Sequence, residues 1–227
     1  MLSKKILYKT LSYVFDISYF KYIDILIKNN DHKANNVIDL GCGEGAIIKS
    51  IAQMFPESNC IGVDLIQTNS SRNNLTFVND DIINFISITD LSGYSLIIMN
   101  DVIEHFDYNQ IIKFMNIVLD KMPKGCRLCL QFPNMSSPFG LRNYFGDHTH
   151  KTALTDVKMS GVLSQFNQIE YNFNGVEESV KFSPISFLLS FIYWKFIIKI
   201  YGLFFRGSIG WNKYFFYPNL FCIVQKL

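Results

Sequence analysis

Residues 37–45 read Val-Ile-Asp-Leu-Gly-Cys-Gly-Glu-Gly, an apolar run that passes through an aspartate into three alternating glycines. A short apolar run next to glycines is typical of a strand in a parallel sheet that is buried on both faces. In such sheets, ligands bind beyond the carboxyl ends of the strands, where the strand order reverses. Gly41 and Gly43 would let backbone amides approach a ligand, and Gly45 would admit an unusual dihedral or close helix packing.

Length and composition favour one large domain. The chain has 227 residues, of which 49% are hydrophobic and 18% charged, so it is long enough for a full core. Its 21 basic and 19 acidic residues are scattered without a block of either sign, and we expect no nucleic-acid partner. The odd number of cysteines, at Cys42, Cys60, Cys126, Cys129 and Cys222, indicates reduced thiols in a cytoplasmic protein.

Strand-like and helix-like runs alternate along the chain. We expect strands at 36–40, 59–63, 74–78, 95–99, 126–132, 167–173 and 218–225, and helices at 44–54, 108–121 and 155–164. Asp107 or Asn109 would cap the second of these helices. This alternation predicts an α/β fold, Rossmann-like, with a seven-stranded, mostly parallel sheet and helices on both faces.

Cys126 and Cys129 form a CxxC pattern in a run that looks like a buried strand. Successive side chains of a strand point to opposite faces, so the two thiols would point apart. We therefore expect a structural role for them. Two other segments, 133–152 and 183–205, do not fit the alternation: the first is polar and glycine-rich, the second very apolar.

The spacing of Gly41, Gly43 and Ala46 also fits a dinucleotide fingerprint, with Asp64 near the position of a ribose-binding acid. Spacing does not separate a nicotinamide cofactor from another adenosine ligand. Asp39 favours the second, because its carboxylate would repel a pyrophosphate but would suit an ammonium or sulfonium group. S-adenosylmethionine carries both of these cations.

The chain resembles the class I S-adenosylmethionine-dependent methyltransferases. The resemblance rests on residues 37–45, Gly-Val-Asp at 62–64, Asn-Asp-Asp-Ile at 79–82 and Ile-Met-Asn-Asp-Val-Ile-Glu-His-Phe at 98–106, which follow the order and spacing of that family. It covers about residues 35–135.

The resemblance implies a cofactor site. Its residues are Asp39, Gly41, Cys42, Gly43, Asp64, Leu65, Asp80, Asp81, Ile82, Asn100 and Asp101. Asp39 and the glycine loop would hold the methionine moiety, Asp64 the ribose hydroxyls, and Asn100 with Asp101 the region beside the sulfonium. Two acids stand in tandem at Asp80 and Asp81, where the family usually has glycine then aspartate. Which of the two reaches the adenine therefore stays open.

A narrower resemblance involves residues 132–155, Phe-Pro-Asn-Met-Ser-Ser-Pro-Phe-Gly-Leu-Arg-Asn-Tyr-Phe-Gly-Asp-His-Thr-His-Lys-Thr-Ala-Leu-Thr. This segment is similar to one in methyltransferases of bacterial surface-polysaccharide biosynthesis and in ubiquinone-type O-methyltransferases. It implies O-methylation of a saccharide or a precursor of a cell-surface glycan such as capsule or lipopolysaccharide. The alternatives are a quinone-like phenol, a phosphoramidate or phosphate group, a nicotinamide-dependent oxidoreductase, and a catalytically silent binding module.

A sugar hydroxyl is a weak acid, so its methylation needs a general base, and histidine is the usual choice near neutral pH. We predict His150 as the base with Asp147 orienting an imidazole, His105 as the second candidate, and His148 on the same side if the segment is extended. A metal ion at Asp147, His148 and His150 would lack an evident fourth ligand, and we predict no metal site. The alternative is that these residues only tie down the loop.

We expect a single domain over 1–227, with N-terminal helices at 1–34, a cofactor-binding core at 35–135 and an acceptor side at 136–227. The N-terminal stretch is interrupted by charges, and we do not expect a secretory signal. The apolar stretch 184–206 carries Lys195 and Lys199 in its middle, each costing roughly 2.5 to 3.5 kcal/mol at a membrane centre, which favours a helix lying at an interface. Packing on the domain, a homodimer contact and peripheral contact with the inner membrane stay open.

Overall fold

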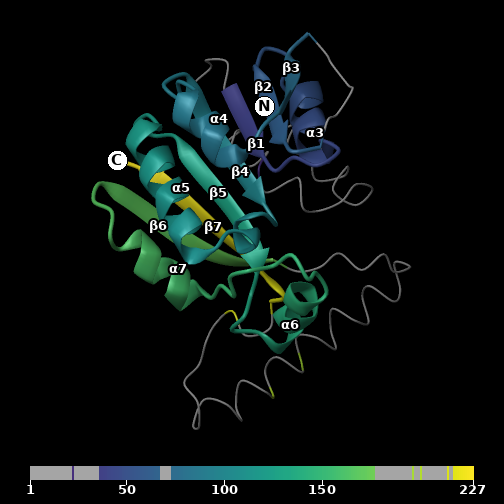
Figure 1. The fold of residues 1–227 in the computed structure, drawn as a ribbon, viewed down its shortest axis with the longest axis vertical. Helices are drawn as coiled ribbons and strands as arrows, with labels where there is room; N and C mark the ends of the chain where they lie inside the picture. Colours follow the sequence, from purple (N-terminus) through teal and green to yellow (C-terminus); the bar gives the residue numbers. More distant parts are fainter. Residues whose placement is uncertain are drawn as a thin grey trace.

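Seven strands form one sheet in the order β3-β2-β1-β4-β5-β7-β6 (Figure 1). The computed structural model describes residues 36–66, 73–176 and 217–227, with Tyr22, Phe196, Ile200 and Tyr214. The strands are β1 Asn36–Leu40, β2 Cys60–Asp64, β3 Leu75–Asn79, β4 Tyr94–Asn100, β5 Arg127–Pro133, β6 Ile169–Val176 and β7 Asn219–Lys226. The first five strands are parallel to one another, while β7 runs antiparallel to β5 and β6. The predicted seven-stranded, mostly parallel sheet is confirmed.

Helices cover both faces of the sheet. They are α3 Ala46–Met54, α4 Ile82–Ile88, α5 Tyr108–Lys121, α6 Pro138–Phe145 and α7 Asp156–Leu163, with a 3-10 turn, η2, at Ile103–His105. The apolar sides of α4, α5 and α7 pack in one core cluster, and α3 packs with Tyr22 in a second cluster on the other face (Figure 1). The layered arrangement predicted from the alternation is therefore present.

The Cys126–Cys129 pair illustrates the alternation of side chains along β5. Cys126, just before the strand, is buried in the cluster with α4, α5 and α7, whereas Cys129 is buried in the cluster with α3. All five cysteines are free thiols. The two thiols point to opposite faces, as predicted, and the pattern serves packing.

The start of α5 is fixed by the first of the two predicted caps. The Asp107 carboxylate accepts a hydrogen bond from the backbone N–H of Gln110, and the Gln110 side chain accepts one from the N–H of Asp107. This reciprocal pair satisfies two of the N–H groups that a helix start leaves without partners.

The segment 133–152 is not a continuous loop, and the prediction missed α6 within it. Ser137 caps this helix and Pro138 occupies its first turn, where a missing N–H is tolerated. The apolar side chains of Phe139, Leu141 and Phe145 are exposed, so the helix has no buried stripe to show as a sequence period. The prediction also missed α4, which has only 7 residues.

The strand order places a switch point between β1 and β4. From β1 the chain builds the sheet outward through β2 and β3, then returns to the other side of β1 with β4 and continues to β5. The carboxyl ends of β1 and β4, at Leu40 and Asn100, therefore open a crevice between the connections that follow them.

The predicted helices at 1–34 and the insertion at 184–206 lie outside the described residues, apart from Tyr22, Phe196 and Ile200. Phe196 and Ile200 are exposed. Within the described part of the chain, no helix combines the length and apolar character needed to cross a membrane.

Two glycines provide a test of the packing around α6. A Cβ added to Gly140 would lie 2.1 Å from the carbonyl oxygen of Asn134, whereas one added to Gly161 in α7 would meet no atom within 4 Å. We expect Gly140→Ala to lower the free energy of unfolding by about 1 to 3 kcal/mol, and the matched Gly161→Ala to raise it by up to about 1 kcal/mol. Denaturant unfolding followed by circular dichroism measures both. Equal stability of the two variants would contradict the close approach of α6 to the end of β5.

Candidate active site

A cavity of about 240 Å³ lies at the carboxyl ends of β1 and β4. Its lining residues are Asp39, Gly41, Cys42, Gly43, Ala46, Ile47 and Asn100. All of these except Ala46 and Ile47 were predicted as cofactor-binding residues. The cavity occupies the switch point of the sheet, where ligands bind in open parallel sheets.

The backbone of the glycine loop is shaped for this position. Gly41 has a φ of 73° and Gly43 a φ of 53°, both in the left-handed region that other residues rarely adopt. A Cβ on Gly41 would lie 2.3 Å from Cγ2 of Val102, so the loop could not pack there with any other residue. Cys42 lies between Gly41 and Gly43, and burial raises the pKa of its thiol to about 12. Cys42 is therefore a small lining side chain and not a thiolate nucleophile.

Asp39 is the most unusual residue of the cavity. Its side chain is 1% exposed, and neither carboxylate oxygen has a hydrogen-bond partner among the described residues. Burial, followed by the negative charge of Asp64, raises the pKa of Asp39 to about 7. A buried carboxylate with no partner is costly, so this group fits a cationic ligand in the cavity.

Asp64 stands beside the cavity at the end of β2. Its Oδ2 accepts a hydrogen bond from the N–H of Gly43 at 2.7 Å, and its Oδ1 accepts one from the N–H of Ile66 at 2.9 Å. The carboxylate is thus tied to the glycine loop, although 21 residues separate Gly43 from Asp64. Leu65, also predicted for the cofactor site, is largely exposed next to it.

The tandem acids Asp80 and Asp81 follow β3, and the N–H of Asp80 donates to the carbonyl of Asp64 at 3.2 Å. Both oxygens of Asp80 accept from the amide of Asn84. Asp81 caps α4, with its Oδ1 accepting from the N–H of Asn84. The side chain of Ile82 is buried in the core, so only its backbone is available to a ligand.

Asn100 and Asp101 end β4 in a hydrogen-bonded network. The Asn100 amide donates to Asp101 at 2.7 Å, and the Gln131 amide donates to both oxygens of Asp101. The Tyr22 hydroxyl donates to Oδ1 of Asn100 at 2.7 Å. Asp101 has a φ of 55°, a strained conformation for a non-glycine residue that concentrates at functional sites. Sequence reasoning missed Gln131 and Tyr22, because neither belongs to a local motif.

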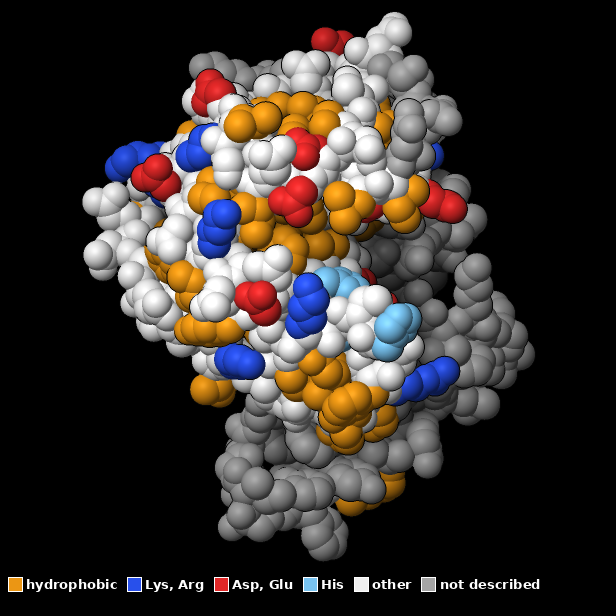
Figure 2. All heavy atoms as spheres, viewed as in Figure 1, with side chains coloured by type: hydrophobic (Ala, Val, Ile, Leu, Met, Phe, Trp, Pro, Cys, Tyr) orange, Lys and Arg blue, Asp and Glu red, His pale blue; other side chains and the backbone are white. Residues whose placement is uncertain are grey.

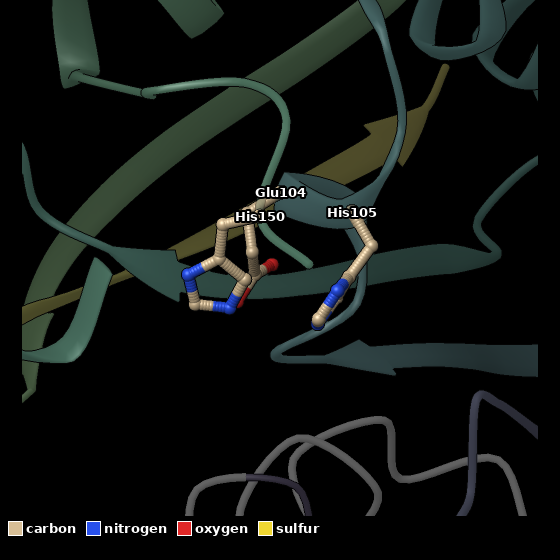
Figure 3. Close-up of side chains that lie close together, drawn as sticks. All are labelled: Glu104, His105 and His150. Atoms are coloured by element: carbon tan, nitrogen blue, oxygen red, sulfur yellow. The ribbon is translucent and has the colours of Figure 1, made fainter. Parts of the chain in front are cut away.

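A second group of side chains, the Glu104–His105–His150 cluster, lies where η2 meets the segment after α6 (Figure 3). Glu104 is 1% exposed, and both its oxygens lack a hydrogen-bond partner among the described residues. Burial raises the pKa of Glu104 to about 8. Nε2 of His150 lies 3.8 Å from Oε1 of Glu104, and the two imidazole rings lie 4.6 Å apart between centroids. Figure 2 shows the histidine side chains, in pale blue, gathered on one part of the surface.

The partners of the two imidazoles fix their tautomers. Nδ1 of His150 lies 2.7 Å from the carbonyl oxygen of Tyr144, which can only accept, so Nδ1 carries a proton. The Thr149 hydroxyl donates its one proton to Asp147 at 2.6 Å, so it accepts from Nδ1 of His105 at 2.8 Å. Burial, and then the nearby His150, lower the pKa of His105 and favour its neutral form. With Nδ1 carrying the proton, either ring keeps the lone pair of Nε2 when it is neutral.

The structure brings three of the four predicted catalytic residues together. Oδ2 of Asp147 lies 3.9 Å from Nε2 of His150, and Asp147 holds His105 through Thr149. The condition set for His148, an extended segment, is not met, because residues 147–150 form a turn closed by a backbone hydrogen bond from His150 to Asp147, and His148 is exposed on it. The metal set of Asp147, His148 and His150 considered from sequence is therefore not assembled.

A model of the family described as a methyltransferase domain matches residues 18–175, which is more than half of the chain. The chain belongs to this family. The methyltransferase is 30% identical, over 79 residues, to the secondary metabolism regulator laeA of Coprinopsis cinerea; this stretch is 34% of the chain but only 20% of that relative.

Solved structures share the fold of this methyltransferase at low identity. A SAM-dependent methyltransferase from Archaeoglobus fulgidus is 19% identical with a TM-score of 0.61, covering 98% of this chain and 94% of that one. The plantazolicin methyltransferase BpumL, solved with a pentazolic desmethylPZN analog and SAH, is 17% identical with a TM-score of 0.62, covering 98% and 90%. These likenesses confirm the Rossmann-like methyltransferase fold.

Asp39 makes the ligand-free stability of the methyltransferase depend on pH. Its pKa rises from 3.8 to about 7, so between these values the folded state binds more protons than the unfolded chain, and the free energy of unfolding falls as pH rises. Asp39→Asn removes this penalty, which corresponds to roughly 4 kcal/mol at most. We expect the variant to be more stable than the parent at about pH 8 and to lose most of that advantage at about pH 5. Urea unfolding at both values tests this, and an advantage independent of pH would contradict it.

Proposed function

We propose that this methyltransferase transfers the methyl group of S-adenosylmethionine to a hydroxyl oxygen of a saccharide or glycan precursor. The observation that carries the cofactor assignment is the buried carboxylate of Asp39, which lines the cavity without a partner among the described residues. S-adenosylmethionine offers an ammonium and a sulfonium, and either charge would compensate the carboxylate. The SAH bound in the BpumL structure supports the choice of cofactor.

The residues around the cavity suit the parts of this cofactor. Asp39 and the bare backbone at Gly41 and Gly43 would hold the methionine end. Asp64 would take the ribose hydroxyls, because each of its oxygens accepts one backbone N–H and keeps a second lone pair. For the adenine, the structure favours Asp81 over Asp80: both oxygens of Asp80 bind Asn84, whereas the cap of α4 uses only Oδ1 of Asp81.

The acceptor side is assigned to the Glu104–His105–His150 cluster. It begins four residues after Asn100, which lines the cavity. Bound S-adenosylmethionine supplies an activated methyl group, so the protein must position the acceptor oxygen and remove its proton. The acceptor oxygen gains the methyl group and gives up its proton, for which the free lone pair on Nε2 of His150 is available.

The identity of the acceptor rests on two arguments. The first is the resemblance of residues 132–155, the segment that contains α6 and His150, to methyltransferases of surface-polysaccharide biosynthesis. The second is chemical, because a phenol with a pKa near 10 needs little help to lose its proton, whereas a sugar hydroxyl needs a dedicated group. The buried cluster provides such a group, so it favours an alcohol over a quinone-like phenol.

The cofactor assignment is tested by calorimetry with SAH. We expect the wild type to bind SAH and not NAD, and Asp39→Asn to bind SAH at least about tenfold more weakly, because it loses a charge-assisted contact. The matched control is Asp90→Asn, an exposed acid that is hydrogen-bonded to Ser92 outside the cavity. Binding of NAD but not SAH, or an unchanged affinity in Asp39→Asn, would overturn the assignment.

The acceptor assignment is tested by methyl transfer to extracts of cells that lack the gene. We expect His150→Gln to lower transfer by about 10² to 10⁴-fold while SAH affinity stays the same, and the exposed His148→Gln to transfer normally. Mass spectrometry of glycans and nucleotide sugars from cells with and without the gene identifies the product as a species heavier by one methylene. If the methylated product were a phenol derivative or a phosphate ester, the saccharide proposal would be wrong.

A further inference from the structure

The Glu104–His105–His150 cluster has the composition and spacing of a metal-ion site. One potential ligand atom from each residue lies within 4.8 Å of the others. Figure 3 shows the Glu104 carboxylate beside the ring of His150, on the side that faces His105. The residues come from two segments, η2 and the turn after α6, that are far apart in sequence and meet here. We propose that this cluster binds one divalent transition-metal ion, and that the ion contacts the acceptor oxygen.

Both imidazoles are prepared as metal ligands. Nδ1 of His150 donates to the carbonyl of Tyr144, and Nδ1 of His105 donates to the Thr149 hydroxyl, which Asp147 holds in turn. Metal-binding histidines typically donate one ring N–H to a carbonyl or a carboxylate-linked group, which fixes the ring and leaves the other nitrogen for the ion. In both rings that nitrogen is Nε2.

The buried carboxylate of Glu104 independently indicates a cation site. Its side chain is 1% exposed and its two oxygens have no hydrogen-bond partner among the described residues, although its main-chain carbonyl accepts from Lys151 and Thr152. Within the described ranges, no lysine or arginine forms an ion pair with Glu104. A buried carboxylate without a compensating positive charge is costly, and a divalent cation would supply that charge.

The donor set narrows the choice of ion. Two imidazole nitrogens and one carboxylate oxygen suit Zn²⁺, Mn²⁺, Fe²⁺ or Co²⁺ better than Ca²⁺ or Mg²⁺, which prefer oxygen ligands. With bonds of about 2.0 to 2.1 Å, ligand atoms lie roughly 3.3 Å apart in a tetrahedral site. The 3.8 Å between Nε2 of His150 and Oε1 of Glu104 is therefore close to the bound spacing, and all three ligand atoms lie within 4.8 Å of one another.

Three protein ligands leave coordination positions open, as in catalytic metal sites. A hydroxyl oxygen bound to such an ion loses its proton more readily, because the positive charge stabilises the alkoxide. This role rests on the proposed function and refines it. The Nε2 lone pair of His150 would then bind the ion, and the proton of the acceptor hydroxyl would pass to solvent water as the oxygen takes the methyl group and S-adenosylhomocysteine leaves. Metal binding itself rests only on the geometry of the cluster.

The test begins with protein that has been treated with a chelator and dialysed. We expect calorimetry with Zn²⁺, Mn²⁺ and Co²⁺ to show one equivalent bound for at least one of them, with a visible absorption band for Co²⁺. Glu104→Gln, His105→Ala and His150→Ala should each weaken binding by at least about tenfold. His148→Ala, exposed on the same turn, is the matched control and should bind like the wild type.

Thermal unfolding with and without the ion distinguishes a loss of metal binding from a loss of stability in a variant. A saturating ion should raise the melting temperature of the wild type and of His148→Ala, but not of His150→Ala. The proposal is overturned if the wild type binds no ion more tightly than a His105→Ala, His150→Ala double variant, or if His148→Ala weakens binding as much as His150→Ala.

Two further measurements separate this proposal from the proposed function. SAH binding is measured with and without chelator, and methyl transfer is measured before and after the ion is restored. If SAH and the acceptor are used equally well by metal-free protein, the metal proposal fails and the methyltransferase assignment stands. If the ion binds at the cluster but SAH does not bind, the proposed function fails and the metal site stands.

Discussion

Burying a carboxylate without a partner is costly, and the described part of this protein does so at two places, Asp39 and Glu104. Each follows or ends a strand next to the switch point of the sheet, and each has a pKa raised mainly by burial. A fold selected only for stability would replace them with apolar or hydrogen-bonded residues. Their retention is understandable if each is completed by a positive charge from outside the chain, one from a cofactor and one from a metal ion.

The parts of the site that follow a strand directly could be predicted from the sequence. Asp39, Gly41 and Gly43 are close together in the chain, and the position of Asp64 follows from the parallel pairing of β1 with β2. Asp107 could be recognised as a cap because the capping box is a local pattern. In each case the physical cause of the arrangement lies within a few residues or in the regular spacing of strands.

The rest of the site depends on contacts that no local pattern encodes. Glu104 meets His150 across 46 residues, and this contact requires both η2 and the turn after α6. The prediction placed His148 on the side of His150 only if the segment were extended, whereas a backbone hydrogen bond closes a turn from Asp147 to His150 and leaves His148 exposed. Similarly, α6 exposes its apolar side chains, so the periodicity that reveals a buried helix is absent.

The two halves of the site are joined through one strand end. Asn100 lines the cavity. Asp101, the next residue, adopts a strained left-handed conformation, and its carboxylate accepts hydrogen bonds from the amides of Asn100 and Gln131. The backbone of Asp101 also lies near the side chain of His105. The left-handed conformation of Asp101 therefore lies between Asn100, which lines the cavity, and η2, which carries Glu104 and His105 of the cluster. Because the proposed methyl transfer depends on alignment of the methyl donor with the acceptor oxygen, the backbone conformation of this one residue would set how the cofactor side and the acceptor side of the site face each other.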